Sequence, residues 1–308
     1  MKKEDIELYD RSIRLWGKDT QMKISQTTVL VVNLTPSSTE LCKDHLLSGI
    51  SLLIADKELV SDKDVNGNFF LCKNDLNKRR CDVLKEKLQK MNTLIKVEAI
   101  DIKEIDDISV PIACVDISTL QREEVAHLDE IFIKKGVIAY YIDTFFDRGF
   151  FVNNLNEVKK APEPRTVKIA LEDCDIVIDE EIDIGKEDIP FDFAASYTFI
   201  SIKEKLMSMI NKIDMNVKEK KIRKVIPHIA YALLQFETAD VNCGMKKEIE
   251  DEMRGLMKEK GNKFYPTECV IGGIVSQEVV KCIAKKEAVN CNVYSYNAIK
   301  EYGDYFNI

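Results

Sequence analysis

Several features that would assign a chain to a large protein class are missing from this sequence. Its 308 residues contain no apolar run of about 18 residues, so a membrane-spanning helix is not expected. Residues 1–5 lead into no apolar segment, so a secretory signal is not expected either. Because the formal net charge is −8, nucleic acid is a poor candidate for the main ligand. What remains is an acidic chain suited to contact with other proteins, and neither a membrane nor a nucleic acid is an expected partner.

Paired cysteines are missing as well. The nine cysteines form no CxxC pair, so a structural zinc site is not expected, and we predict no metal site. An odd number of cysteines without a secretory signal also argues against a disulfide framework. Four of them, Cys42, Cys114, Cys269 and Cys282, lie in apolar runs, where cysteine behaves as a small hydrophobe. Any cysteine could act as a nucleophile, but only with a base to activate it.

Glycine is missing where a nucleotide-binding fold would need it. Thr28–Val32 is a short apolar run, typical of a strand buried on both faces of a parallel sheet, and Ser51–Ala55 is a second one. Residues 39–48 between them have helical periodicity, and Asp56 follows the second strand. Such a unit opens many nucleotide-binding folds. Its turn, residues 33–38, contains no glycine, so we predict the frame without a phosphate-binding loop.

Strands and helices alternate through the first half of the chain. Further strands are predicted at 96–100, 112–115 and 137–142, helices at 6–25, 77–91 and 120–135, and a hairpin at 145–152. The tail adds a helix at 265–281 and a closing strand at 293–297. This alternation predicts an α/β fold with a Rossmann-like, doubly wound and mostly parallel sheet.

Residues 153–262 differ from both flanks. Residues 153–190 contain Pro162, Pro164, Pro190 and an acidic stretch, which indicates a connector on the surface. The rest of this segment has helical patterns. We therefore predict one domain built from residues 1–152 and 263–308, with the connector and a helical insertion at 153–262 between the two parts.

Two segments carry a resemblance to a known family. Residues 9–17 read Tyr-Asp-Arg-Ser-Ile-Arg-Leu-Trp-Gly, and the helix predicted at 265–281 contains Gly272 and Gly273. Together they resemble the ubiquitin-like-protein activating enzymes of the ThiF-like superfamily, in particular the smaller, non-cysteine subunits of heterodimeric SUMO-activating enzymes. The resemblance implies an adenylation domain.

The resemblance also implies that the family's ATP site is degenerate here. Asp56 stands at the family's acidic segment after the second strand, and Asp116 at the place of its magnesium-binding aspartate. Active members carry Asn-Arg-Gln before a phenylalanine, whereas residues 66–69 read Asn-Gly-Asn-Phe, so the arginine is lost. Arg80 stands where active members have an ATP-contacting lysine. The resemblance therefore implies that Asp56, Asn66 and Asp116 are vestigial and that this chain alone holds neither ATP nor Mg²⁺.

The partner implied by the resemblance is a larger subunit with a competent ATP site. In the family's heterodimers the degenerate half lends one arginine across the interface, and here that residue is Arg11. The implied dimer interface includes Trp16, Gly272 and Gly273. The larger catalytic SUMO-activating subunit would bind ATP and Mg²⁺, SUMO and the conjugating enzyme would be indirect partners, and the location would be nuclear, cytoplasmic or both.

Three functions stay open at this point. The chain is the non-catalytic subunit of a SUMO-type activating enzyme (or of an enzyme for another ubiquitin-like modifier), a homodimeric ThiF/MoeB-like adenylyltransferase, or a Rossmann oxidoreductase that binds a dinucleotide. The missing glycines weigh against the last two, and the missing arginine at position 67 weighs against the second. Asp56 and Asp116 are equally consistent with plain polar residues at strand ends, and Gly272 and Gly273 with a helix contact inside one chain.

Overall fold

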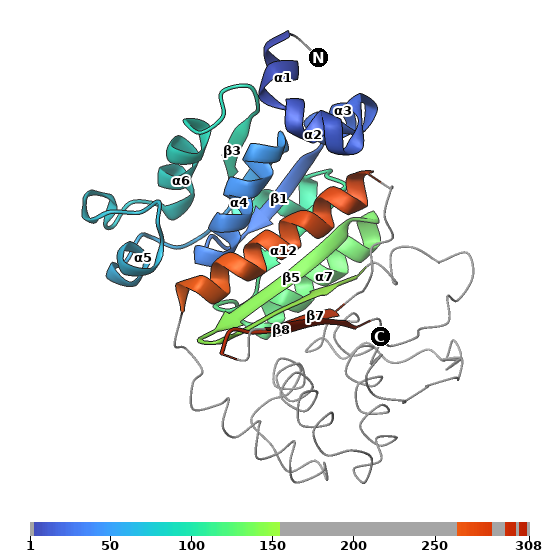
Figure 1. The fold of residues 1–308 in the computed structure, drawn as a ribbon. Helices are drawn as coiled ribbons and strands as arrows, with labels where there is room; N and C mark the ends of the chain where they lie inside the picture. The colour runs from blue at the N-terminus through green and yellow to red at the C-terminus, as the bar shows by residue number, and fades with distance from the viewer. Residues whose placement is uncertain (1–2, 155–263, 285–292, 300–301, 307–308) are drawn as a thin grey trace, which may run out of the picture.

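The computed structural model describes residues 3–154, 264–284, 293–299 and 302–306 (Figure 1). These residues form one eight-stranded sheet, in the order β3-β2-β1-β4-β5-β6-β7-β8, with helices on both faces. Within these ranges no helix is long and apolar enough to cross a membrane. The connector and helical insertion predicted at 153–262 lie almost entirely outside the described residues, so the predicted division of the chain stays a prediction.

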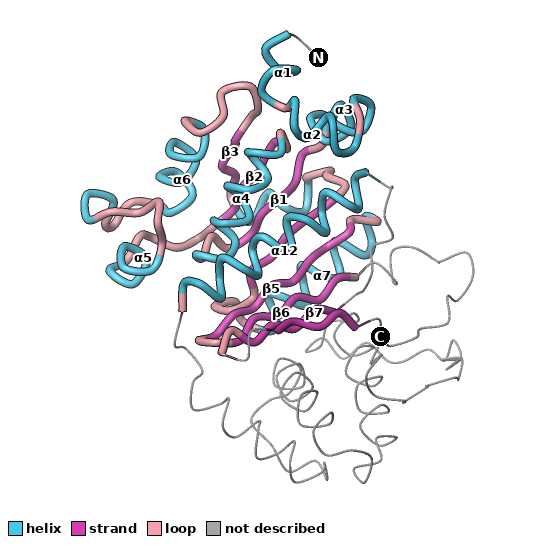
Figure 2. Tube along the Cα trace, viewed as in Figure 1, coloured by secondary structure: helices cyan, strands magenta, loops and turns pink. Residues whose placement is uncertain are grey.

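The elements follow the alternation that the sequence predicts (Figure 2). The α-helices are α1 (Lys3–Leu8), α2 (Asp10–Trp16), α3 (Lys18–Gln26), α4 (Pro36–Ser48), α5 (Asp62–Gly67), α6 (Arg80–Gln89), α7 (Arg122–Lys135) and α12 (Tyr265–Ala284), and the short 3₁₀ helices are η1 (Lys73–Asp75) and η2 (Ile102–Asp107). The strands are β1 (Thr28–Val32), β2 (Ser51–Ala55), β3 (Val97–Ile100), β4 (Ile112–Asp116), β5 (Ile138–Phe145), β6 (Arg148–Asn153), β7 (Val293–Asn297) and β8 (Tyr302–Phe306).

The sheet is parallel in its first half and antiparallel in its second. Strands β3, β2, β1, β4 and β5 are parallel neighbours, with Val29 of β1 opposite Leu52 of β2 and Ile112 of β4. Strands β5 to β8 form antiparallel pairs. The chain winds outward from β1 to β3 on one side and from β4 onward on the other. The predicted α/β, doubly wound and mostly parallel sheet is confirmed, and its strand order reverses between β1 and β4.

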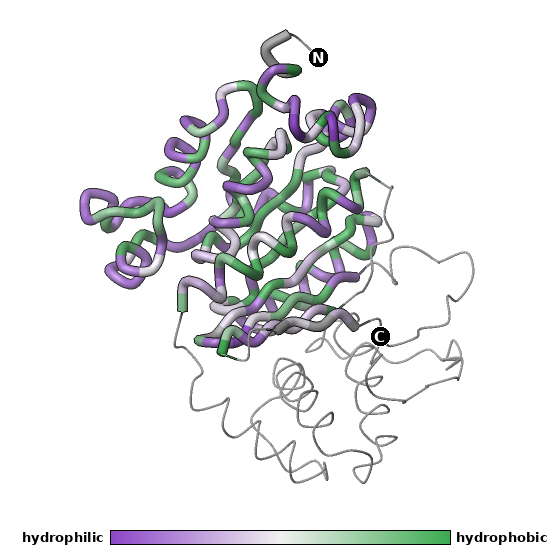
Figure 3. Tube along the Cα trace, in the orientation of Figure 1, coloured by the Kyte–Doolittle hydropathy of each residue, from purple (hydrophilic) through white to green (hydrophobic). Residues whose placement is uncertain are grey.

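The core has two apolar layers, one on each face of the sheet. Val29 and Val31 of β1 pack with residues of α4, α6 and α12, whereas Leu30 and Val32 pack with residues of α7. Figure 3 shows the central strands as mostly hydrophobic between helices that alternate in hydropathy. Burial on both faces explains why these strands read as continuous apolar runs in the sequence.

Several elements differ from prediction. The helix predicted at 6–25 is three helices, α1 to α3, separated at Tyr9 and Gly17. Helix α4 begins at Pro36 instead of residue 39, because proline suits the first turn of a helix, where its missing N–H has no partner to lose. Helix α6 begins at Arg80 instead of residue 77, because Asn77 has φ +61°, which no α-helix accommodates. Strand β8 was not predicted at all. The predicted end of α4 is confirmed, since Gly49 closes it with φ +92°.

Helix α12 lies against α4 at unusually short range. A Cβ placed on Gly272 would lie 2.5 Å from the carbonyl oxygen of Ser37 and 3.1 Å from the backbone nitrogen of Leu41. The same construction on Gly273 meets nothing closer than 3.5 Å, at Asp44 Oδ2. The close packing of α12 on α4 therefore explains why residue 272 is a glycine. This is the contact inside one chain that the sequence analysis left open beside a dimer interface. Contact of Gly273, on the partly exposed side of α12, with a second subunit stays a prediction.

The two adjacent glycines give a matched pair of substitutions. Gly272→Ala should destabilise the fold by about 1–3 kcal/mol, because the backbone of α4 must shift to admit the methyl group. Gly273→Ala should be neutral, or stabilising by up to about 1 kcal/mol, because alanine favours a helix and space is available. Urea denaturation of both variants checks this. Equal effects of the two substitutions would contradict the packing that we describe.

Candidate functional site

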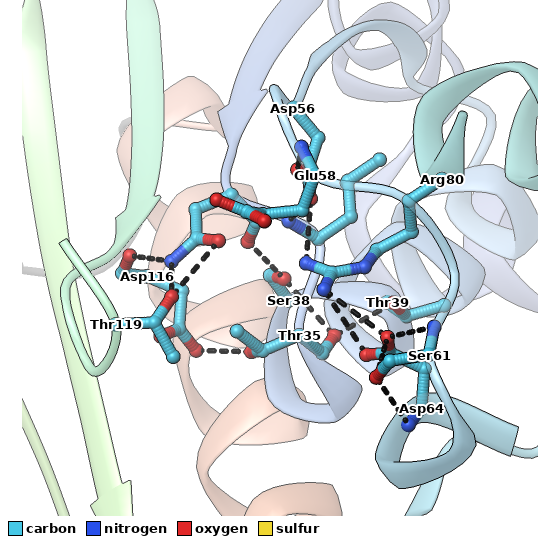
Figure 4. A network of polar contacts seen from close by, with 12 residues as sticks. Thr35, Ser38, Thr39, Asp56, Glu58, Ser61, Asp64, Arg80, Asp116 and Thr119 are labelled. Carbon is cyan, nitrogen blue, oxygen red and sulfur yellow. Dashed lines mark hydrogen bonds and ion pairs between the residues drawn. The ribbon is translucent and has the colours of Figure 1, made fainter. Parts of the chain in front are cut away.

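The candidate site lies where the strand order reverses, at the carboxyl ends of β1, β2 and β4. Ligands of open α/β sheets bind at such a point. Asn33 leaves β1 with φ +67°, and its side-chain amide donates to the carbonyl oxygen of Asp116 (2.7 Å) and to Thr119 Oγ1 (2.9 Å). Figure 4 shows this turn with the side chains of Asp56, Arg80 and Asp116 gathered around it. The structure thus brings together Asp56 and Asp116, the two acids predicted from strand ends.

Asp56 is buried, and donors from its own chain satisfy it. Its Oδ2 atom accepts the backbone N–H of Leu34 (2.7 Å) and a guanidinium N–H of Arg80 (2.9 Å), and its Oδ1 atom accepts the backbone N–H of Glu58 (2.7 Å). Donors of the same chain thus occupy three of the about four acceptor positions of this carboxylate, and one of these donors is charged.

Arg80 joins two carboxylates in the interior. Its Nη1 lies 2.9 Å from Asp56 and its Nη2 lies 3.2 Å from Asp64, and the three side chains are between 1% and 11% exposed. The planar guanidinium offers separate N–H groups to two acceptors at once, which an ammonium group cannot do as well. In this structure Arg80 therefore connects the end of β2, the short helix α5 and the first residue of α6.

Asp64 is a site residue that the sequence reading missed. It closes a capping box on α5, since it accepts the backbone N–H of Ser61 (2.8 Å) while the Ser61 hydroxyl caps the helix. The spacing Ser-x-x-Asp is a known helix-start signal and could have revealed it. Asn66, the predicted vestigial residue of the same helix, is exposed.

Position 67, where active relatives of the resembled family carry arginine, lies beside the first turn of α4. A Cβ on Gly67 would lie 3.8 Å from Pro36 Cγ. The turn after β1 and this position are thus neighbours, as a shared phosphate site would require. Neither supplies the group that such a site needs, because the turn has no glycine and position 67 has no cation.

Asp116 is fully buried at the end of β4, and four donors surround it. Its Oδ2 atom accepts the hydroxyls of Thr35 and Ser37, and its Oδ1 atom accepts the backbone N–H (3.0 Å) and hydroxyl (2.6 Å) of Ser118. Thr35 and Ser37 belong to the start of α4, where the helix dipole favours a negative charge. The carboxylate of Asp116 thus lies at the N-terminal end of α4, where a helix can bind an anion.

These contacts decide what the site can hold. A Mg²⁺ ion at Asp116 would have to compete with the hydroxyls of Thr35 and Ser37, and a ribose at Asp56 would have to share the carboxylate with Arg80 and two backbone N–H groups. Among the described residues, no group of three or more His, Cys, Asp or Glu side chains could hold a metal ion. ATP and Mg²⁺ would meet two carboxylates here that already accept hydrogen bonds from their own chain.

An ion pair spans the outer rim of the site. Lys57, next to Asp56, donates to Glu124 near the start of α7. This hydrogen bond raises the pKa of Lys57 and lowers the pKa of Glu124, so both stay charged near neutral pH. Because both side chains are partly exposed, we attribute no large stabilisation to the pair.

The structure gives no support to a cysteine nucleophile on α4 or β4. Cys42 and His45 lie three residues apart on α4, and both are fully buried. Burial raises the pKa of the Cys42 and Cys114 thiols and lowers the pKa of His45 to about 3. Thiols of this kind stay protonated, whereas a reactive cysteine needs a thiolate in an electropositive setting.

Arg11, the predicted catalytic residue, lies at the opposite edge of the sheet. Helix α2 leads into α3, which ends one residue before β1 begins, and Figure 1 shows α1, α2 and α3 grouped at that end. The five residues of β1, about 16 Å of strand, separate this edge from Asn33. Arg11 therefore cannot complete the site of its own chain.

Two arginines of α2 differ in their environment. Arg14 pairs with Asp10 one turn earlier (2.9 Å), whereas Arg11 is exposed and forms no ion pair with any described residue. Trp16, predicted at the dimer interface, is half-buried and donates its indole N–H to Gln21 Oε1 (2.9 Å). A role of Trp16 toward a second subunit stays a prediction.

Solved structures define the class of fold. The chain resembles the crystal structure of Escherichia coli MccB with succinimide (TM-score 0.56, 13% identity, 97% of this chain and 71% of that chain). It also resembles selenomethionine-labelled PaaA (TM-score 0.59, 14% identity, 98% and 82%). One of the similar MccB structures contains AMPCPP and MccA. The chain has an α/β, Rossmann-like fold of the adenylation type.

Comparisons of sequence are more specific than the likeness of folds. The model of the ThiF family matches residues 9–117 of the chain. Full-length relatives include the DNA damage tolerance protein rad31 of Schizosaccharomyces pombe (27% identity, 96% of this chain, 94% of the relative). SUMO-activating enzyme subunit 1 of Dictyostelium discoideum (24%, 97% and 92%) and of Homo sapiens (23%, 97% and 94%) are also similar. The resemblance noted in the sequence is thereby confirmed, and ATP and Mg²⁺ are the ligands of this kind of fold.

The buried arginine provides a test of the site's present role. Arg80→Ala should destabilise the fold by about 3–5 kcal/mol, because it leaves the carboxylates of Asp56 and Asp64 buried without their counter-ion. Arg79→Ala is the control, since Arg79 is exposed and 3.8 Å from Asp82, and should change stability by less than about 1 kcal/mol. Urea denaturation of both variants measures the difference. A stable Arg80→Ala variant would show that the carboxylates do not depend on this ion pair.

Proposed function

We propose that this chain is the regulatory, non-cysteine subunit of a heterodimeric SUMO-activating enzyme. The larger catalytic subunit would hold ATP, Mg²⁺ and the cysteine that forms the thioester, and this chain would support adenylation of the modifier. Similarity over nearly the whole length of proteins named SUMO-activating enzyme subunit 1 supports the assignment. The observation that carries it is the saturation of Asp56 and Asp116 by donors of their own chain.

The active contribution of this chain would be Arg11, supplied to the partner's ATP site. Adenylation develops negative charge on the α-phosphoryl group and on the departing pyrophosphate. A guanidinium offers planar, permanently charged donors to such oxygens. Arg11 suits this role because it is exposed, has no ion pair in the described part of the chain, and lies far from the chain's own filled site.

The expected partners follow from these roles of the two subunits. The larger subunit is the direct partner, and SUMO and the conjugating enzyme are reached through it. A nuclear or cytoplasmic location is consistent with this role and is part of the proposal. A homodimeric adenylyltransferase would need a working ATP site in this chain, and nothing in the geometry favours one.

The isolated chain should not bind Mg·ATP measurably in calorimetric titration up to millimolar nucleotide. The physical reason is that both expected ligand carboxylates already have internal donors. The reconstituted heterodimer, titrated in parallel, should bind one nucleotide. A micromolar dissociation constant for the chain alone would contradict the proposal.

Asp116→Asn sharpens this comparison. Asparagine keeps the size of the side chain and one carbonyl oxygen for the hydroxyls of Thr35 and Ser37, but it lacks the negative charge of a magnesium ligand. Its amide nitrogen cannot accept from Ser118, so assembly of the complex is checked alongside binding. Nucleotide binding by the heterodimer should be unchanged, because the working aspartate belongs to the larger subunit. Loss of binding in an intact complex would place the ATP site in this chain.

Arg11→Ala should assemble normally with the larger subunit and lose about 10²- to 10³-fold in the rate of ATP–pyrophosphate exchange, as expected for removal of one donor to a developing charge. Arg11→Lys should lose most of this rate too, because an ammonium cannot present the same planar pair of donors.

Arg14→Ala is the matched control on the same helix. Its ion pair with Asp10 is exposed, so its removal should leave exchange within about twofold. Wild-type exchange by Arg11→Ala would refute the role of Arg11. Equal losses in both arginine variants would point to general damage to α2.

A further inference from the structure

An exposed apolar side chain lies one helical turn from Arg11. Leu15 of α2 is 78% exposed, and Leu8, at the end of α1, is 58% exposed. Residues four apart on a helix are neighbours on its surface, so Arg11 and Leu15 share a face. A single exposed leucine needs no explanation. A leucine this exposed, one turn from the one arginine that the proposed function requires and with Leu8 three residues before that arginine, is a more specific arrangement.

The opposite face of the same segment is fixed to the body of the protein. Tyr9 is buried and its hydroxyl accepts a hydrogen bond from the side-chain amide of Asn92 (2.8 Å). Trp16 bonds Gln21, whose own amide donates to the carbonyl oxygen of Ser48 (2.9 Å). The helix therefore cannot rotate to bury Leu15 against its own chain without losing these contacts.

The chemistry of the face indicates what covers it. It combines an apolar surface with a guanidinium that has no ion pair in the described part of the chain, which suits a groove beside a polyanion. A second copy of this chain does not provide one, because the corresponding site is filled by Asp116 and Arg80. The larger subunit of the proposed heterodimer, which would hold ATP, would provide one.

We infer that Leu15, assisted by Leu8, is a positioning residue that docks into an apolar groove of the larger subunit and holds Arg11 against the ATP phosphates. This inference rests on the proposed function of Arg11. An arginine side chain has several rotatable bonds, and a fixed contact one turn away limits the position of its Cα. Misplacement of a catalytic group by about 1 Å can cost about 10²-fold in rate.

The experiment is ATP–pyrophosphate exchange by the reconstituted heterodimer at saturating larger subunit, with ATP varied to separate kcat from KM. Leu15→Ala should reduce kcat/KM for ATP about 10- to 100-fold. Leu15→Met, which preserves an apolar side chain of similar volume, should stay within about threefold. Leu59→Ala is the control, because Leu59 is also exposed (51%) but follows β2 at the opposite edge of the sheet. It should exchange like the wild type.

A double variant tests whether Leu15 acts through Arg11. In an Arg11→Ala background, Leu15→Ala should cause no further loss, because the group that it positions is gone. Wild-type exchange by Leu15→Ala, or an equal loss in both backgrounds, would overturn the inference and leave the role of Arg11 intact. A weaker complex with normal exchange at saturating partner would assign Leu15 to affinity alone and overturn its positioning role. Wild-type exchange by Arg11→Ala would instead remove the proposed function, and this inference with it.

Discussion

The carboxyl edge of this sheet depends on one buried guanidinium held between two carboxylates. A buried charge is stable only where opposite charge and hydrogen bonds replace the lost water, and Arg80, Asp56 and Asp64 supply this for one another. A nucleotide site keeps such groups available for its ligand, whereas here they are paired within the chain. Arginine suits this role better than a lysine would, because its fork reaches two acceptors. These three side chains thereby link β2, α5 and α6.

Most of the fold was predictable because its strands are buried on both faces. Such strands appear as short apolar runs, and their alternation with helical patterns defines a doubly wound sheet. The errors lie where a local conformation overrides periodicity. Asn77 has a left-handed backbone conformation, so α6 begins after it. Pro36 fits the first turn of a helix, so α4 begins three residues before the predicted start. The edge strand β8 has no continuous apolar run, since Tyr302–Phe306 mixes aromatic residues with glycine and aspartate.

The position of the site was predictable from the sequence, but the hydrogen-bond partners of its acids were not. Strand ends of a parallel sheet meet at one edge, so Asp56 and Asp116 had to lie near each other whatever their role. Their partners come from tertiary contacts across 24 residues in one case and about 80 in the other, which no local pattern encodes. Asp64 had a local signal in its capping box, but nothing in the sequence connects it to Arg80. Sequence therefore locates the acids, and only the structure shows that each is already satisfied.

The two edges of the sheet are under different physical constraints. At the carboxyl edge each acid has an internal donor, so its residues stabilise the chain without any ligand. At the amino edge Arg11 and Leu15 contribute little to the isolated chain, because an exposed charge and an exposed leucine gain almost nothing from folding. In the proposed heterodimer they act through a contact outside the chain. Between the edges, α3 is held to the end of α4 by Gln21, so the segment that carries Arg11 has a fixed base. In the proposed heterodimer, a domain with a filled pocket still serves, because catalysis needs from it a rigid support for one arginine.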